Sequence, residues 1–214
     1  MKIVLMGPPG SGKGTQASFV ASLVQVNSVS SGDLFRENLA NDTELGKLAK
    51  TYMDQGKYVP DDVTINMVMS WIEDPENNRG FILDGFPRTL SQAQALDDRL
   101  SEVGGIDKVI LFKVPELELI KRLSGRMLCR KCQTPYHKEF YPPINDGACD
   151  KCGGDLFQRD DDSEVVMKER LKVYRQETDP VVERYKGTGN ILEIDGSLPI
   201  RVVEKSLRGC NNFP

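Results

Sequence analysis

A glycine-rich segment near the N-terminus has the residue types and spacing needed to bind phosphate. Residues 7–15 read GPPGSGKGT and directly follow the apolar stretch from Lys2 to Met6. We expect that stretch to form a buried strand and residues 14–25 to form a helix. In such a strand–loop–helix arrangement, backbone N–H groups and the helix N-terminus surround a phosphate, and Lys13 reaches the outer phosphates. The segment therefore predicts a nucleotide-phosphate site; a glycine-rich connection without a ligand is the alternative.

Two residues are expected to bring Mg²⁺ to this loop. Most phosphate-binding loops place Ser or Thr directly after the lysine, whereas this chain has Gly14 there and offers its hydroxyl one position later, at Thr15. Asp84 ends a second apolar stretch, residues 81–83. A carboxylate at the end of a parallel strand can hold a Mg²⁺-bound water beside the loop. We expect Thr15 and Asp84 to bind Mg²⁺ through water; the alternative is that Asp84 only caps a turn.

Four of the five cysteines fall into two C-x-x-C pairs, Cys129 with Cys132 and Cys149 with Cys152. Two such pairs can supply four thiolates in a tetrahedral array for a structural Zn²⁺, which can replace the hydrophobic core of a small subdomain. Sulfur ligands also suit iron, so the metal is left open. Redox-active or free thiols are the alternative reading of the pairs.

Two further residues near or beyond these pairs are not assigned to the metal. His137, the only histidine, lies between the pairs, and we expect it to be a structural or surface residue because four thiolates already complete a site. Cys210 has no neighbouring cysteine and is expected to be a bystander in a frayed C-terminal tail, residues 209–214.

Arginines are spread along the chain in positions where they can serve one anionic site. The guanidinium group matches phosphate oxygens with a planar fork and stays ionised at neutral pH, so several of them in one cleft would neutralise two polyphosphate chains. Taken singly, each is as well explained by surface solvation. The candidates are Arg36, Arg88, Arg122, Arg126, Arg159 and Arg170.

The elements that position these residues alternate between short apolar strands and helices, which is typical of an α/β fold with a parallel five-stranded sheet flanked by helices. Pro115 is expected at a first helical position, and Thr89 with Gln92 fits a capping box. The expected strands cover residues 2–6, 27–29, 81–83, 109–114 and 191–194. The expected helices cover residues 14–25, 32–39, 43–55, 61–72, 89–103, 115–126, 164–185 and 199–208.

Composition and charge narrow the classes of function. A net charge of -4 disfavours a surface that binds nucleic acid by neutralising its phosphates. No apolar run approaches the ~20 residues needed to cross a bilayer, and no signal-peptide pattern precedes the glycine loop. We therefore expect a cytoplasmic protein without a nucleic-acid or membrane partner. We also expect the protein to be a monomer.

Together these motifs resemble the adenylate kinase family, in the long bacterial form whose lid carries a metal, and the resemblance covers essentially the whole chain. It implies a P-loop NTPase-like core of residues 1–29, 60–126 and 163–214, a helical AMP-binding insertion of residues 30–59 and a lid of residues 127–162. It also implies transfer of the terminal phosphoryl group of MgATP to AMP, giving two ADP. The motifs that carry it are residues 7–15, 30–36, 56–59, 83–89 with Gln92, 125–126, the paired cysteines, Arg159 with 161–162, and 170–171.

The same resemblance implies a role for individual residues. Pro87 would follow a cis peptide bond, and Leu198 would contact the adenine of ATP through its backbone. The residues matching the ATP site are Gly10, Ser11, Gly12, Lys13, Gly14, Thr15, Arg126, Pro135, Tyr136 and Leu198. Those matching the AMP site are Ser31, Arg36, Lys57, Tyr58, Val59, Gly85, Phe86, Pro87, Arg88, Gln92, Arg159 and Arg170. The residues expected to act on the transferred phosphoryl group are Lys13, Arg88, Arg126, Arg159 and Arg170.

Several alternatives remain open at this point. Ser31 stands where the family usually has Thr, so a kinase for UMP or CMP is a second enzyme hypothesis. Gln92 is explained either by an adenine contact or by the capping box with Thr89. Different classes of protein are a zinc-ribbon ATPase that binds nucleic acid and a four-cysteine interaction module with a vestigial P-loop.

Overall fold

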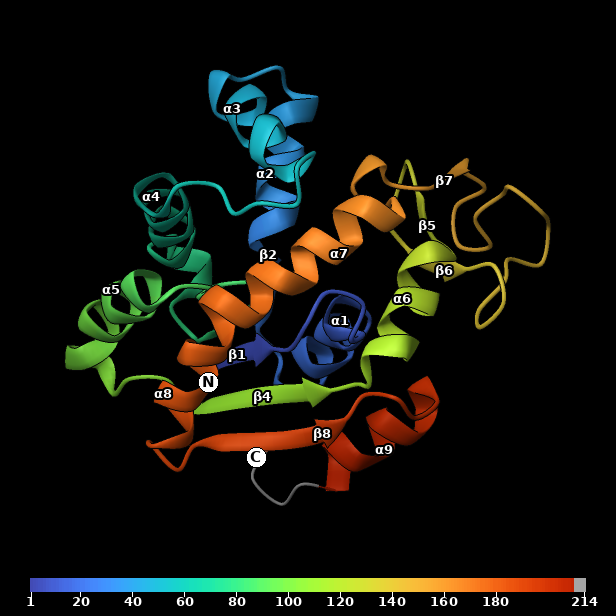
Figure 1. Cartoon of the computed structure of the whole chain (residues 1–214). Coiled ribbons are helices and arrows are strands. Elements are labelled where there is room, and N and C mark those ends of the chain that lie inside the picture. The colour runs from blue at the N-terminus through green and yellow to red at the C-terminus, as the bar shows by residue number, and fades with distance from the viewer. Residues whose placement is uncertain (210–214) are drawn as a thin grey trace.

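A five-stranded parallel sheet forms the centre of the molecule, as the sequence predicts. In this computed structural model, which describes residues 1–209, the strands lie in the order β2-β3-β1-β4-β8 (Figure 1). All neighbouring pairs are parallel. The strands are β1 Lys2–Met6, β2 Asn27–Ser30, β3 Phe81–Asp84, β4 Lys108–Lys113 and β8 Ile191–Asp195. Cys210 and the tail beyond Gly209 lie outside the described residues, so the expectations for them stay predictions.

Helices are found wherever the sequence predicts them, with ends that shift by a few residues. The α-helices are α1 Lys13–Val24, α2 Ser31–Ala40, α3 Glu44–Met53, α4 Asp61–Ile72, α5 Leu90–Leu100, α6 Glu116–Ser124, α7 Glu164–Val173, α8 Asp179–Lys186 and α9 Ile200–Gly209. Short 3₁₀ turns cover Pro75–Asn77, Ser101–Val103 and Asp160–Asp162. No helix among residues 1–209 is long and apolar enough to cross a membrane.

Three local expectations need correction. Pro115 is the N-cap of α6 rather than its first helical residue. The Thr89 hydroxyl accepts a hydrogen bond from the Gln92 backbone N–H at 3.2 Å, as a capping box requires, but the Gln92 side chain accepts from Arg88 N instead of closing the box. The helix expected over residues 164–185 contains a π-helical turn, Tyr174–Thr178, between α7 and α8. Such turns often occur at functional sites, and apolar periodicity does not reveal them.

Helices cover both faces of the sheet because strand residues alternate between the two faces. Val4 and Met6 of β1 pack in one cluster with buried side chains of α4, α5 and α8. Ile3 and Leu5 pack in a second cluster with side chains of α1 and α9. Burying each such aliphatic side chain stabilises the fold by about 1.5–3 kcal/mol. This double-sided core holds the strand ends, and hence the loops that follow them, in fixed positions.

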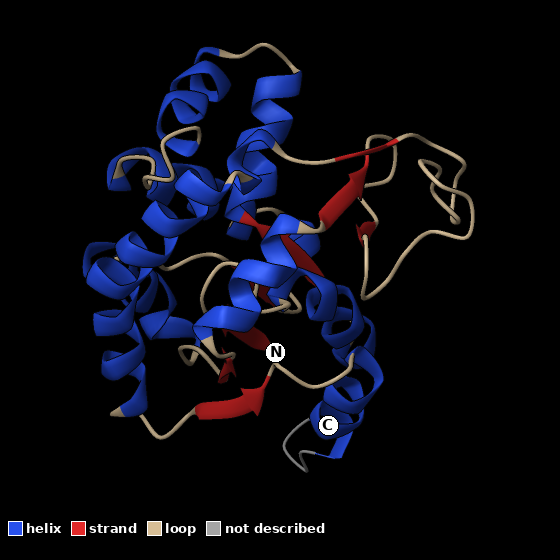
Figure 2. Cartoon of the chain, turned by 45° about the vertical axis from the view of Figure 1, so that its right-hand side comes forward, coloured by secondary structure: helices blue, strands red, loops and turns tan. Residues whose placement is uncertain are grey.

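Two insertions extend from this core, each with a small cluster of buried side chains of its own. The α2–α3 insertion, residues 30–59, is held together by Phe35, Ala49 and Val59. The four-cysteine subdomain, residues 127–162, contains the antiparallel sheet β6-β5-β7. Its strands are β5 Arg126–Cys129, β6 Pro135–His137 and β7 Leu156–Phe157. Figure 2 shows this subdomain, mostly strands and loops, standing away from the helical body.

Candidate active site

A cleft of 1120 Å³ lies where the sheet and both insertions meet. Residues at the C-terminal ends of β1, β2 and β3 line it, among them Met6, Ser30 and Asp84. Open parallel sheets bind their ligands at this edge, outside the carboxyl ends of the strands. The volume is slightly above the usual range for a pocket that binds one small molecule, about 300–1,000 Å³, which leaves room for more than one ligand.

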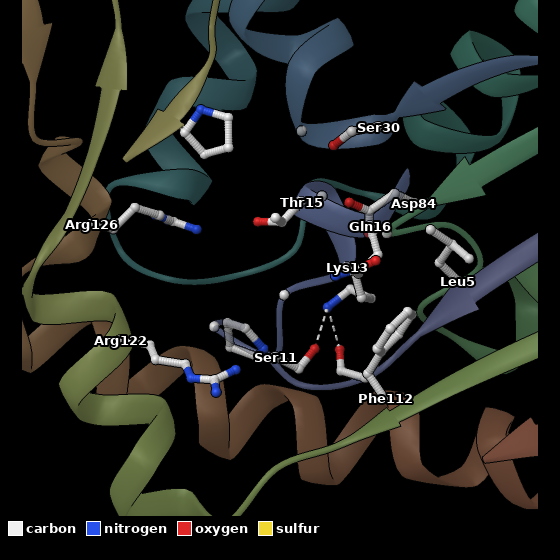
Figure 3. Close-up of a pocket in the computed structure, with 18 of the residues that line it drawn as sticks. Leu5, Ser11, Lys13, Thr15, Gln16, Ser30, Asp84, Phe112, Arg122 and Arg126 are labelled. Carbon is white, nitrogen blue, oxygen red and sulfur yellow. Dashed lines mark hydrogen bonds between the residues drawn. The ribbon is translucent and has the colours of Figure 1, made fainter. Parts of the chain in front are cut away.

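The glycine loop presents Lys13 at the base of this cleft. The Lys13 ammonium donates hydrogen bonds to Gly7 O at 2.6 Å and Pro8 O at 3.0 Å, and lies 3.4 Å from Ser11 Oγ (Figure 3). Burial lowers the pKa of Lys13 to about 8, although the Asp84 carboxylate opposes this shift. A buried ammonium with a lowered pKa is stabilised by any anion that approaches it. The loop therefore favours a negatively charged ligand.

Gly14 leaves room between the start of α1 and Asp84. A Cβ atom at this position would lie 3.5 Å from Asp84 Oδ2, so any longer side chain would reach towards the carboxylate. Burial raises the pKa of Asp84, while the positive charges of Lys13 and Arg88 lower it. Thr15 lines the same cleft as Asp84, and its hydroxyl points into the space between Asp84 and Arg126 (Figure 3). A hydroxyl and a carboxylate oxygen are ligands that suit Mg²⁺, so this pair fits the predicted ion.

The turn after β3 is built around Gly85. Its φ of +72° is in the left-handed region, which favours glycine, and an added Cβ would lie 2.6 Å from Arg88 Nη2, so a side chain there would strain the backbone and displace the guanidinium. The Gly85 carbonyl accepts from the Ser31 hydroxyl at 2.6 Å and from Arg88 Nε at 2.7 Å. The peptide bond between Phe86 and Pro87 is cis, as predicted. The turn thus fixes Arg88 beside Ser31.

Two aspartates hold two arginines on the side of the four-cysteine subdomain. Arg126 Nε donates to Asp162 Oδ2 at 2.8 Å, and Arg170 Nη1 donates to Asp161 Oδ2 at 2.9 Å. Asp162 Oδ1 also lies 3.5 Å from Arg170 Nη1, so this fully buried carboxylate bridges both guanidinium groups. Figure 3 shows Arg126 across the cleft from Asp84.

Arg36 and Arg159 carry unused hydrogen-bonding capacity. Among the described residues, the buried Nε atoms of both have no hydrogen-bond partner. The Asp33 carboxylate pairs with Arg36 and lies 3.7 Å from Arg159 Nη2, and the Asp161 carboxylate is also close enough to raise the pKa of Arg159. Burial lowers the pKa of Arg159, and the neighbouring Arg36 and Arg126 charges add to this effect. Buried donors without partners cost free energy, so these two arginines favour binding of an anion.

The four paired cysteines come together as a cluster, as predicted. Their Sγ atoms lie within 4.8 Å of one another and form no disulfide. Three of the Sγ–Sγ distances are 3.3 Å, 3.4 Å and 3.5 Å. A tetrahedral site with Zn–S bonds of about 2.3 Å has Sγ–Sγ edges of roughly 3.8 Å, so the cluster is close to the geometry that a Zn²⁺ requires. Hydrogen bonds from Thr134 lower the pKa of Cys132 to about 6, which favours the thiolate.

His137 does not join this cluster. Its Nδ1 accepts from the backbone N–H groups of Glu139 at 3.0 Å and Phe140 at 3.1 Å, which leaves Nε2 to donate to Lys121 O at 3.2 Å. Both ring nitrogens are therefore used to hold the loop after β6, which agrees with the structural role expected from the sequence.

The residues predicted to bind the nucleotides or Mg²⁺ line the cleft, with one exception. Phe86 is buried in the hydrophobic core under the turn and does not line the cleft. Tyr136 lines it, but its hydroxyl points into the four-cysteine subdomain and accepts from Asp150 N at 2.8 Å. The lining residues that match the predictions are Gly10, Ser11, Gly12, Lys13, Gly14, Thr15, Ser31, Arg36, Lys57, Tyr58, Val59, Asp84, Gly85, Pro87, Arg88, Gln92, Arg126, Pro135, Tyr136, Arg159, Arg170 and Leu198.

Sequence reasoning missed residues that act on the site through other residues. Arg122, one of the arginines considered for a phosphate role, lines the cleft and donates to Gly196 O at 2.6 Å and Ser197 O at 2.9 Å, so it also fixes the loop that precedes Leu198. Thr178, in the π-helical turn, donates to Arg88 O at 2.9 Å. No local motif marks such residues, because their partners are distant in the sequence.

Comparisons with known proteins agree with this geometry. The sequence profile of the adenylate kinase family, described as "Adenylate kinase", matches residues 5–190. The chain belongs to the adenylate kinase family. The adenylate kinase of Archaeoglobus fulgidus is 48% identical over 208 residues, which cover 97% of this chain and 96% of that protein. The adenylate kinase of Carboxydothermus hydrogenoformans is 48% identical over 211 residues, which cover 98% of this chain and 99% of that protein. The chain is therefore a phosphotransferase that uses ATP and AMP, as the sequence predicts.

We expect the Asp162 carboxylate to stabilise the folded protein, because it lies between Arg126 and Arg170. Asp162→Asn leaves Arg126 and Arg170 facing each other without the bridging charge, and we expect a loss of about 3 kcal/mol in the free energy of unfolding. Urea denaturation measures this loss. Glu193→Gln, which removes an exposed partner of Lys113, serves as control and should cost less than about 1 kcal/mol. Equal losses in the two variants would contradict the bridging role of Asp162.

Proposed function

We propose that the cleft binds MgATP on the glycine loop and AMP beside the α2–α3 insertion, so that the terminal phosphoryl group passes between them. The ATP side comprises residues 10–15 together with Arg126, Pro135, Tyr136 and Leu198. The AMP side comprises Ser31, Arg36, residues 57–59, Gly85, Pro87, Arg88, Gln92, Arg159 and Arg170, with Phe86 supporting the turn from the core. In domain terms, residues 30–59 bind AMP and residues 127–162 form a lid.

The observation that carries this proposal is the convergence of cationic side chains from separate elements on one point. Lys13 from the glycine loop lies close enough to Arg88, Arg126 and Arg170 that each of these charges lowers the pKa of Lys13. Like charges brought together in a buried cleft repel one another, so the arrangement is stable only with anions or carboxylates between them. Two phosphate chains meeting there satisfy that requirement.

The chemistry requires positioning and charge neutralisation rather than a protein nucleophile. Lys13 and the guanidinium groups of Arg88, Arg126, Arg159 and Arg170 stabilise the charge that spreads over the transferred phosphoryl oxygens. Mg²⁺, when bound with ATP near Thr15 and Asp84, neutralises further phosphate charge. Closure of residues 127–162 over the cleft would exclude the water that otherwise hydrolyses ATP.

The four cysteines are proposed to hold one structural metal ion, Zn²⁺ in the first instance and iron as the alternative. The metal lies in the lid and takes no part in the reaction, because the four Sγ atoms lie within 4.8 Å of one another and none of the four cysteines lines the cleft. We further propose that the protein works as a cytoplasmic monomer, and its net charge of -4 disfavours a nucleic-acid partner.

The decisive assay measures ADP formed from ATP with each nucleoside monophosphate in turn. Ser31 keeps the hydroxyl that bonds Gly85, so we expect AMP to be preferred over UMP and CMP by at least about 100-fold in kcat/KM, the discrimination that a site built for hydrogen bonds can reach or exceed. Comparable turnover of UMP or CMP would replace the AMP assignment with the second enzyme hypothesis.

Arg88→Lys tests the placement of the transferred group. Lysine keeps the charge but loses the planar fork and the bond from Nε to Gly85 O, so we expect kcat to fall by at least about 100-fold with the melting temperature unchanged. Arg99→Lys, at an exposed arginine that pairs with Glu73, is the matched control and should retain full activity. Turnover of Arg88→Lys within twofold of the wild type would remove Arg88 from the active site.

Metal removal tests the role of the cysteines. We expect one tightly bound metal ion per chain, lost in Cys129→Ser and kept in Cys210→Ser, because Cys210 belongs to neither pair. Loss of the metal should increase hydrogen exchange in residues 127–162 and leave the sheet protected, since the small lid has little other core. Elemental analysis and hydrogen-exchange mass spectrometry measure these effects. Unchanged exchange in the metal-free protein would contradict a structural role for the metal.

A further inference from the structure

Gln92 is held by two partners that differ in chemical character. The residue as a whole is only 1% exposed, yet it lines the cleft. Gln92 Oε1 accepts a hydrogen bond from Arg88 N at 2.8 Å, and Gln92 Nε2 donates one to Asp61 Oδ1 at 2.7 Å. The other oxygen of Asp61 accepts from the Thr89 hydroxyl at 2.7 Å. Asp61, the first residue of α4, thus links this helix to the start of α5 and to the Gln92 amide.

These partners fix which way the amide faces. A backbone N–H can only donate, and an ionised carboxylate can only accept. Rotating the amide by 180° would bring Nε2 against the Arg88 N–H and Oε1 against the Asp61 carboxylate, which replaces two hydrogen bonds by two repulsive contacts. Leaving buried polar groups unpaired in this way costs about 1–3 kcal/mol for each group. The reversed orientation is therefore excluded while Asp61 is present.

The fixed amide retains one donor and one acceptor for a ligand. A primary amide has two N–H donors and two carbonyl lone pairs, and Asp61 and Arg88 use one of each. The 6-amino group and N1 of adenine present a donor beside an acceptor, which match Oε1 and Nε2 of Gln92. Hypoxanthine and guanine present the 6-oxo group and N1–H, an acceptor beside a donor, and would oppose like with like.

We infer that Asp61 is a specificity-determining residue, which selects AMP over 6-oxopurine monophosphates by holding the Gln92 amide in the orientation that matches adenine. This inference rests on the proposed contact between Gln92 and the base of AMP. Asp61 itself does not touch the nucleotide; it acts as a positioning residue through Gln92. Asp61 is not among the residues that line the cleft, which agrees with an indirect role.

The test compares AMP with IMP, because IMP changes the 6-position and N1 without adding the 2-amino group of GMP. In Asp61→Asn the new amide can donate or accept towards Gln92, so only the Arg88 N–H still opposes the reversed orientation of the Gln92 amide. The cost of reversal then falls from two unpaired contacts to one. We expect the ratio of kcat/KM for AMP to that for IMP to fall at least tenfold, mainly through a higher KM for AMP and a lower KM for IMP. This ratio does not depend on the fraction of folded enzyme, so partial unfolding of the variant leaves the test valid.

Three further variants separate the possible outcomes. Asp62→Asn removes the same charge from the same turn of α4 at an exposed position and should leave the ratio unchanged. Asp61→Glu keeps an obligatory acceptor and should keep most of the selectivity even where kcat falls. Gln92→Leu removes the amide and should abolish the discrimination between AMP and IMP.

Each result has one meaning for the inference. If Asp61→Asn lowers kcat/KM equally for AMP and IMP while Gln92→Leu changes the ratio, the base contact stands and the role of Asp61 is overturned. If Gln92→Leu leaves the ratio unchanged, the proposed contact between Gln92 and adenine is wrong, and the inference falls with it. An equal loss of selectivity in Asp61→Glu and Asp61→Asn would also overturn the inference, because the acceptor would then not be the cause.

Discussion

The rest of the structure depends on one electrostatic constraint, the concentration of positive charge at the C-terminal edge of the sheet. The chain carries a net charge of -4, yet Lys13, Arg88, Arg126 and Arg170 lie close enough to influence one another. Buried like charges are costly, and the protein offsets them with carboxylates placed between them, above all Asp161 and Asp162. The arginines that we propose to bind phosphate therefore also form the ion pairs that fix the wall of the cleft.

The fold satisfies this constraint by drawing the charges from different parts of the chain. Lys13 follows β1 in a loop anchored to the double-sided core, and Arg88 follows β3 in a turn whose left-handed backbone at position 85 favours glycine. Arg126 begins β5 of the four-cysteine subdomain, and Arg170 lies on α7. The charge cluster is complete only when the subdomain and α7 lie against the sheet. Movement of residues 127–162 would carry Arg159, Asp161 and Asp162 with it. It would therefore change the charges around Arg126 and Arg170 as well as the access of water to the cleft.

The sequence predicts the parts of this arrangement that have local signals. The glycine loop and the paired cysteines specify their chemistry by spacing, and the strand alternation predicts the parallel sheet. The π-helical turn is not predictable in this way, because its residues still follow a helical pattern. Arg122 was one of six arginines considered for phosphate binding, and its hydrogen bonds to loop carbonyls were not predicted, since residue type alone does not say which oxygens a guanidinium meets. Asp61 carries no motif at all, because its partners lie 28 and 31 residues away in the sequence.

Gln92 shows how structure can remove one of two explanations that are equivalent in sequence. A capping box accounts for a glutamine three residues after Thr89 only if its side chain returns to the N-cap. Here the cap uses the backbone N–H of Gln92, which any residue except proline would supply. The side chain instead bonds to Arg88 N and Asp61, so helix capping does not explain why the residue is glutamine. Those two bonds require an amide, with one acceptor and one donor. They leave a second donor and a second acceptor of the same amide for the adenine contact that we propose.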